Sequence, residues 1–158
     1  MNVEHKGTIA NSPAGYNGFY TLGVSSYIKR NYELTGYNFC GASAGAGNSL
    51  FLAFKGDDED YVDEMLDRVD VVGKKHMSHV LKAVCDYHLD KYTTDDFDLH
   101  RLSIGVTNVK YLENQCHLYY EFDSLKDAVE CTRASCNIPF VSGNPLNLYR
   151  NRFAYDGV

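Results

Sequence analysis

The chain has 158 residues, of which 44% are hydrophobic and 23% carry a charge, and this size and composition fit one folded domain with its own core. Its formal net charge of −6 at pH 7 argues against a nucleic-acid-binding protein, because phosphate contacts need a basic surface. The same charge weakens any attraction to anionic lipid headgroups. No stretch is apolar for long enough to cross a bilayer, so we expect no transmembrane segment.

The N-terminus and the cysteines predict a cytoplasmic protein. Residues 1–6 are polar and lead directly into a strand, so we expect no secretory signal peptide. An odd number of cysteines without C-x-x-C spacing favours reduced, mostly buried thiols inside the cell. These cysteines are Cys40, Cys85, Cys116, Cys131 and Cys136. The protein is expected in the cytoplasm, and the family resemblance described below adds the periphery of membranes or lipid droplets.

Strand and helix patterns alternate through the first third of the chain. Residues 7–11 predict a strand and residues 18 to about 31 a helix. A second strand over residues 37–40 precedes a helix over residues 46–54. Such an order is typical of α/β domains.

Two amphipathic helices follow, over residues 57–72 and 74–89. The first begins with four acidic residues, 57–60, which suit the positive end of a helix dipole, and we favour this interpretation over a metal site. The apolar side of the second helix carries Met77, Val80, Leu81, Val84 and His88. Each helix is therefore expected to pack one face against the domain.

The segment after these helices predicts a loop and then two strands. Residues 90–100 are polar and acidic and are interpreted as a surface loop, with a mobile cover over a lipid site as the alternative. The β-rich runs 102–107 and 116–122 flank a polar turn at Glu113 and Asn114.

A capped helix and a short strand complete the order. Ser124 followed by Asp127 is typical of a helix N-cap and predicts a helix over residues 125–134. Residues 153–155 predict a strand that delivers Asp156 onto a glycine turn. No repeat, low-complexity tract or linker interrupts the sequence, so a single α/β domain is expected.

Residues 41–45 read G-A-S-A-G between a predicted strand and a predicted helix. A strand-to-helix turn of this kind holds the serine hydroxyl outward above the helix N-terminus, and its glycines let neighbouring backbones pass closely. That is the geometry an acyl-transfer nucleophile needs. The pattern alone is weak, because small residues also flank serines by chance.

Three other ligand-binding interpretations fail on their spacing. Residues 42–49 imitate a phosphate loop, but Asn48 stands where the lysine is needed. Residues 45–50 lack the third glycine of a dinucleotide fingerprint, and residues 95–98 lack the glycine turn and distal glutamate of a calcium loop. We therefore expect no metal and no organic cofactor.

Three further segments join the G-A-S-A-G turn in a family resemblance. Residues 12–24 carry a glycine-containing strand-to-helix loop, residues 134–140 read A-S-C-N-I-P-F, and residues 156–157 read D-G. In this order they resemble the patatin-like phospholipase family, which has an oxyanion loop, a G-x-S-x-G serine, an A-S-x-x-I-P-x segment and a D-G-[GA] aspartate. The sequences of these motifs are most similar to those of the animal branch that contains adipose triglyceride lipase.

The resemblance implies a fold and a domain organisation. We expect a three-layer α/β fold with a mostly parallel central sheet flanked by helices, in a single domain over residues 1–158. Family members continue beyond the aspartate, so the sequence is expected to be a segment of a longer protein.

The resemblance also implies a catalytic dyad with Ser43 as nucleophile and Asp156 as base. The six histidines follow no triad context. A partly desolvated carboxylate can accept the serine proton directly, because burial raises its pKa towards working pH. Taken alone, Asp156 would be interpreted as a turn aspartate before glycine.

The family's oxyanion loop, G-G-G-x-[RK]-G, corresponds here to Pro13, Ala14, Gly15, Tyr16, Asn17 and Gly18. Pro13 has no N–H, Ala14 replaces a glycine, and Asn17 stands where many members carry a basic residue. Ala14 and Gly15 keep their amides and are the expected donors. The nucleophile elbow consists of Gly41, Ala42, Ala44 and Gly45 around Ser43.

The expected function is cleavage of carboxylic esters in phospholipids, acylglycerols or galactolipids through an acyl-Ser43 intermediate. The altered oxyanion loop keeps a second interpretation open, a patatin-fold lipid-binding or regulatory protein with little or no turnover. A third is an unrelated α/β domain in which the four motif matches are accidental.

Overall fold

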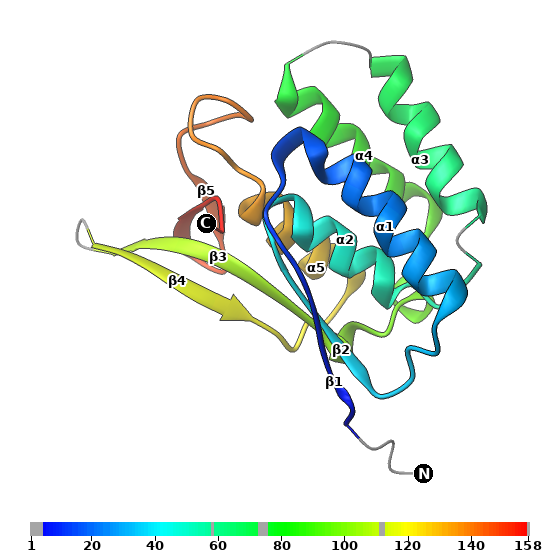
Figure 1. Ribbon diagram of the computed structural model, residues 1–158. Helices are drawn as coiled ribbons and strands as arrows, with labels where there is room; N and C mark the ends of the chain where they lie inside the picture. The colour runs from blue at the N-terminus through cyan, green and yellow to red at the C-terminus, as the bar shows by residue number, and fades with distance from the viewer. Residues whose placement is uncertain (1–4, 58, 73–75, 111–112, 158) are drawn as a thin grey trace.

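The computed structural model describes residues 5–57, 59–72, 76–110 and 113–157, which form an α/β domain around one mixed sheet (Figure 1). The strands are β1 (Gly7–Asn11), β2 (Tyr37–Ala42), β3 (Leu102–Lys110), β4 (Glu113–Tyr119), β5 (Asn147–Tyr149) and β6 (Arg152–Tyr155). The helices are α1 (Gly18–Asn31), α2 (Ala44–Ala53), α3 (Glu59–Val72), α4 (Met77–Lys91) and α5 (Leu125–Ser135). The α/β prediction is confirmed.

The sheet has the order β1-β2-β3-β6-β5, with β4 also paired to β3. The strands β1, β2 and β3 are mutually parallel, as predicted, whereas β4, β5 and β6 pair in antiparallel fashion. Parallel neighbours need a crossover connection, and helices supply it between β1 and β2 and between β2 and β3. The antiparallel strands follow the final crossover and extend the sheet.

The helices form two layers on the sheet. Helices α2 and α5 contact the strands directly, and α1 and α4 pack on these two helices, with α3 against α4. Figure 1 shows the helices gathered to the right of the sheet. The core between them is apolar, with Phe39, Phe51, Ile104, Val106 and Ala128 all fully buried.

Two helix predictions are confirmed, the range of α1 and the N-cap of α5. Helix α1 spans the range expected from its spacing, and the Ser124 hydroxyl accepts a hydrogen bond from the Asp127 amide, 3.2 Å away, at the start of α5. Helix α4 begins at Met77, and the expected earlier start falls on residues outside the described part. No helix among the described residues is both long and apolar enough to cross a membrane.

The surface-loop prediction for residues 90–100 is wrong in part. Phe97 and Leu99 are buried, because the backbone of this segment pairs with the end of α2, where the Asp98 amide donates to Ala53 O at 2.7 Å. Asp96 accepts hydrogen bonds from Thr93, so its carboxylate closes a local turn. None of these residues lines the cavity described below.

Two strand predictions are also corrected. Glu113 and Asn114 begin β4 and pair with Lys110 and Val109, so they form no turn. The connection between β3 and β4 lies at residues 111–112, outside the described part. The short strand β5 was not expected, and it pairs with β6 through Asn147, Leu148 and Tyr149.

Candidate active site

Two strands bring Ser43 and Asp156 to one point on the sheet. Ala42 at the end of β2 pairs with Gly105 of β3, and Tyr155 at the end of β6 pairs with Thr107. Strand β2 runs parallel to β3 and β6 antiparallel to it, so their C-terminal ends approach each other along the same edge of β3. The residues that follow the two strands, Ser43 and Asp156, therefore meet.

Ser43 lies on a tight turn between β2 and α2. Its backbone has a positive φ of 53° with ψ of −132°, a conformation that non-glycine residues rarely adopt. A Cβ on Gly41 would lie 2.1 Å from Gly45 O, and a Cβ on Gly45 would lie 2.2 Å from Asn11 O. The two flanking glycines are thus required by close backbone approach, as the G-x-S-x-G pattern predicts.

The Ser43 hydroxyl donates a hydrogen bond to Asp156 Oδ2 at 2.9 Å. Both side chains are nearly buried, with 4% of Ser43 and 8% of Asp156 exposed. A carboxylate that accepts a hydrogen bond from a serine hydroxyl is in position to take its proton. The structure thus brings together the two residues that the sequence motifs singled out.

The segment at the end of α5 holds both members of this pair. The Asp156 amide donates to Asn137 O at 2.9 Å, and the Gly157 amide donates to Ser135 O at 3.0 Å. On the other side, the Cys136 thiol donates to Ser43 O at 3.0 Å. Gly157 admits no side chain, because a Cβ there would lie 2.1 Å from Gly105 O.

Ser135 is the centre of this arrangement. Its buried hydroxyl accepts a hydrogen bond from the Ser43 amide at 2.8 Å and donates one to Gly105 O at 2.6 Å. One side chain therefore ties the serine turn to β3, beside the place where β6 ends. The sequence placed Ser135 in a motif without giving it a role.

Replacing Ser135 with alanine is expected to lower kcat of any reaction that uses the Ser43 hydroxyl by up to about 10²-fold, with little change in KM. The reason is that the Ser43 amide and Gly105 O lose their common partner, so the turn shifts relative to Asp156. Unfolding free energy should fall by about 1–3 kcal/mol. Steady-state kinetics with a soluble p-nitrophenyl ester, beside urea unfolding, measures both effects.

The matched control is Ser25→Ala, which removes an equally buried hydroxyl from α1, one that donates to Asn11 Oδ1 at 3.4 Å and not to the Ser43 turn itself. It should lower stability and leave kcat near the wild-type value. A Ser135→Ala protein with wild-type kcat would show that the hydroxyl only stabilises the fold.

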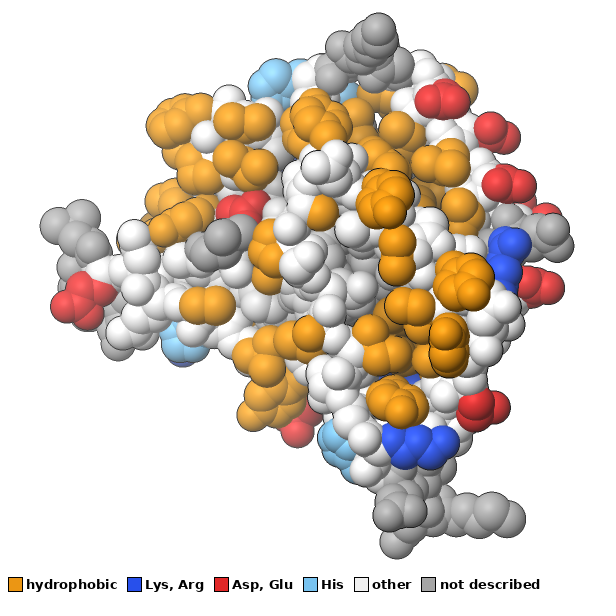
Figure 2. All heavy atoms as spheres, viewed as in Figure 1, with side chains coloured by type: hydrophobic (Ala, Val, Ile, Leu, Met, Phe, Trp, Pro, Cys, Tyr) orange, Lys and Arg blue, Asp and Glu red, His pale blue; other side chains and the backbone are white. Residues whose placement is uncertain are grey.

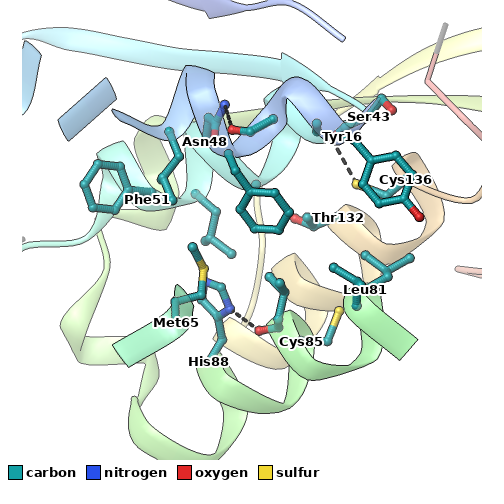
Figure 3. Close-up of a pocket in the computed structure, with 18 of the residues that line it drawn as sticks. Tyr16, Ser43, Asn48, Phe51, Met65, Leu81, Cys85, His88, Thr132 and Cys136 are labelled. Atoms are coloured by element: carbon teal, nitrogen blue, oxygen red, sulfur yellow. Dashed lines mark hydrogen bonds between the residues drawn. The ribbon is translucent and has the colours of Figure 1, made fainter. Parts of the chain in front are cut away.

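An apolar cavity leads away from Ser43 towards α3 and α4. The empty space inside it, with its open mouth included, is about 920 Å³. Figure 3 shows Ser43 near one end and His88 near the other. Helix α4 contributes Met77, Val80, Leu81, Val84, Cys85 and His88 to its wall. The apolar side predicted for this helix therefore faces the cavity.

The far end of the cavity is closed by a neutral polar pair. His88 Nδ1 donates to Val84 O at 2.6 Å, so His88 Nε2 is the acceptor for the Tyr61 hydroxyl. Burial lowers the pKa of His88 to about 4 and raises that of Tyr61 well above its usual value. Neither group carries a charge at neutral pH, which keeps the cavity floor compatible with an apolar ligand.

Two cysteine thiols line the same cavity and compete with Ser43 as candidate nucleophiles. Burial raises the pKa of Cys85 to about 11 and that of Cys136 far above its usual value. Since the thiolate is the reactive form, both cysteines stay inert at neutral pH. All five cysteines of the chain are free thiols. Ser43 is therefore the nucleophile that the cavity offers.

The loop predicted to hold the oxyanion borders the cavity only in part. Gly15, Tyr16 and Gly18 line it together with Ser43, whereas Pro13, Ala14 and Asn17 do not. Gly15 has a positive φ of 53°, which turns the chain there. A Cβ on Gly18 would lie 2.6 Å from the Ala44 side chain, so this loop packs directly on the serine turn. Of the two expected donors, Gly15 lies at the cavity wall.

No metal centre emerges from the described residues, which hold no cluster of three or more histidine, cysteine, aspartate or glutamate side chains. Sequence reasoning missed the wall formed by α4 and the closing pair of His88 and Tyr61. The sequence signal for this wall was the row of apolar residues on one side of α4. The sequence did not show what this side of the helix would face.

A comparison of the chain with protein-family models finds no match, and a comparison with curated proteins finds none either. What the site can do chemically therefore follows from its own geometry: a serine on a strained turn, a carboxylate in hydrogen-bond contact with it, and an apolar cavity beside both.

Proposed function

We propose that the chain is a serine lipid acyl hydrolase of the patatin-like type, which cleaves a carboxylic ester of a phospholipid or an acylglycerol. The observation that carries this proposal is the 2.9 Å hydrogen bond from Ser43 Oγ to Asp156 Oδ2 at the end of an apolar cavity. The sequence motifs around the two residues support it independently.

In the acylation step, Ser43 Oγ attacks the ester carbonyl carbon while its proton passes to Asp156 Oδ2. The tetrahedral oxyanion needs N–H donors beside Ser43, and the amides of Gly15 and Ala44 belong to residues at the cavity wall. Collapse of this intermediate breaks the ester bond, and the leaving alcohol takes the proton from Asp156. An acyl group remains on Ser43.

In the second step, Asp156 takes a proton from water, whose oxygen attacks the acyl carbonyl carbon. The carboxylic acid leaves, and Ser43 recovers its proton from Asp156. The acyl chain would occupy the apolar cavity, whose walls and neutral floor suit a hydrocarbon chain. The free thiols support a cytoplasmic location for this reaction.

A fluorescent fluorophosphonate tests the proposal directly, because it phosphonylates only an activated serine. Wild-type protein should gain one adduct, and peptide mass spectrometry should place it on Ser43. Labelling on another serine would contradict the proposed site. Folded protein that takes no label would favour the lipid-binding function without turnover.

A further inference from the structure

Two of the segments that border the cavity carry no charged side chain. Residues 7–28 contain no aspartate, glutamate, lysine, arginine or histidine, and the same holds for residues 134–149. The first segment forms β1 and most of α1, and the second connects α5 with β5. A chain with 36 charged residues, 15 basic and 21 acidic, thus keeps two long stretches next to the site free of them.

These uncharged segments expose large apolar side chains. On the α1 side, Tyr16, Tyr20, Val24 and Tyr27 are 60%, 76%, 43% and 61% exposed. The last three lie on one face of α1, because they are four and three residues apart, and Tyr16 lies in the 3-10 turn just before the helix. On the other segment, Phe140 is 79% exposed. We call these five residues the mouth face.

The mouth face is continuous with the cavity. Tyr16 lines the cavity and is largely exposed, so the cavity opens beside it. Ile138 also lines the cavity, two residues before Phe140. Figure 2 shows hydrophobic side chains over α1 and over the segment that precedes β5, and several of the acidic side chains in this view lie along the edge beside α3.

The chemistry of the mouth face fits a lipid surface. Tyrosine rings are amphipathic and settle at the level of lipid headgroups, and phenylalanine inserts deeper. Burying this face desolvates no charge, and it offers no lysine or arginine to anionic lipid. We propose that the mouth face docks on the surface of an uncharged or zwitterionic lipid layer, so that the cavity opens directly onto lipid. This inference rests on the proposed function, since it names how the hydrolase reaches its substrate.

The chain contains no tryptophan, so the emission of an introduced tryptophan reports on one position alone. Tyr20→Trp, placed in a Ser43→Ala background to prevent hydrolysis, gives a single fluorophore on the mouth face. With phosphatidylcholine vesicles we expect a blue shift of its emission and quenching by brominated phosphatidylcholine. The matched control, Tyr120→Trp, labels a residue that is 58% exposed just after β4, and its emission should not change.

The strength of docking is measured by vesicle flotation. The double change Tyr20→Ser with Phe140→Ser should weaken binding to phosphatidylcholine vesicles by about tenfold or more, because the protein loses two aromatic rings that docking would bury in the lipid. Tyr120→Ser should have no effect. Raising the salt concentration should leave wild-type binding unchanged, since no charge pair contributes.

Three results would overturn the proposal. The emission of Tyr20→Trp could stay unchanged with phosphatidylcholine vesicles, or the protein could bind vesicles only when phosphatidylglycerol is added. The emission could also shift to the blue without vesicles, by an amount that grows with protein concentration. The last result would assign the face to a second copy of the chain. Fluorophosphonate labelling of wild-type protein without vesicles reports the dyad separately. Vesicle binding without labelling would therefore retain the docking surface and reject the hydrolase.

Discussion

Replacing Ser43 with alanine is expected to abolish ester hydrolysis, with kcat reduced by roughly 10⁴- to 10⁶-fold. The hydroxyl is the attacking atom in the proposed reaction, and Cys85 and Cys136 in the same cavity are held as thiols by burial. Neither cysteine in the cavity wall can therefore replace it. Hydrolysis of p-nitrophenyl esters and fluorophosphonate labelling both measure the loss.

The companion change Ser43→Gly separates chemistry from backbone strain. Glycine tolerates the positive φ of 53° at this position, whereas alanine does not. Both variants should be inactive, but the glycine variant should be more stable than the alanine variant by about 1 kcal/mol in urea unfolding. Equal stabilities would mean that the turn stores no strain, and residual hydrolysis in either variant would reject Ser43 as the nucleophile.

Replacing Asp156 with asparagine is expected to lower kcat by about 10²- to 10⁴-fold, the usual contribution of a general base. Asparagine has the same shape, and its side-chain oxygen still accepts the Ser43 hydrogen bond, but it cannot take a proton at neutral pH. Acylation should slow most, so single-turnover release of p-nitrophenol is the measurement. KM should change little, because the cavity wall does not include Asp156.

The control for this change is Asp127→Asn on the same side of the molecule. Asp127 binds Tyr149 and Arg150 and does not line the cavity. Its substitution should reduce stability without reducing kcat. If Asp156→Asn retained wild-type kcat, the proton of Ser43 would have to leave by another route, and the dyad would be rejected.

The parts of the fold that follow from local pattern were predictable from the sequence. The range of α1 and the N-cap of α5 depend on neighbouring residues, and both matched. The turn at Ser43 was equally local, because two glycines and a serine at fixed spacing describe its close backbone contacts. The motif wording also singled out Asp156, which the structure brings to Ser43.

What the sequence could not supply depends on distant partners. Phe97 lies in an acidic stretch for which the sequence predicts exposure to solvent. It is buried because it forms an antiparallel β-bridge with Phe54, which is distant in the sequence. Strand β5 is three residues long and exists through its pairing with β6. The apolar stripe of α4 indicated burial, and periodicity alone does not distinguish a packed core from the wall of a cavity.

The meeting of β2 and β6 on one edge of β3 has a consequence for the order in which the protein becomes active. Ser43 and Asp156 are 113 residues apart in the chain, and they meet only after β6 has paired with β3. The serine turn relies on the hydrogen bond between the Ser43 amide and the Ser135 hydroxyl, so it also depends on α5. If the proposed dyad is correct, a chain that has not yet paired β6 with β3 would lack the contact between Ser43 and Asp156, and activity should appear only when the sheet is complete.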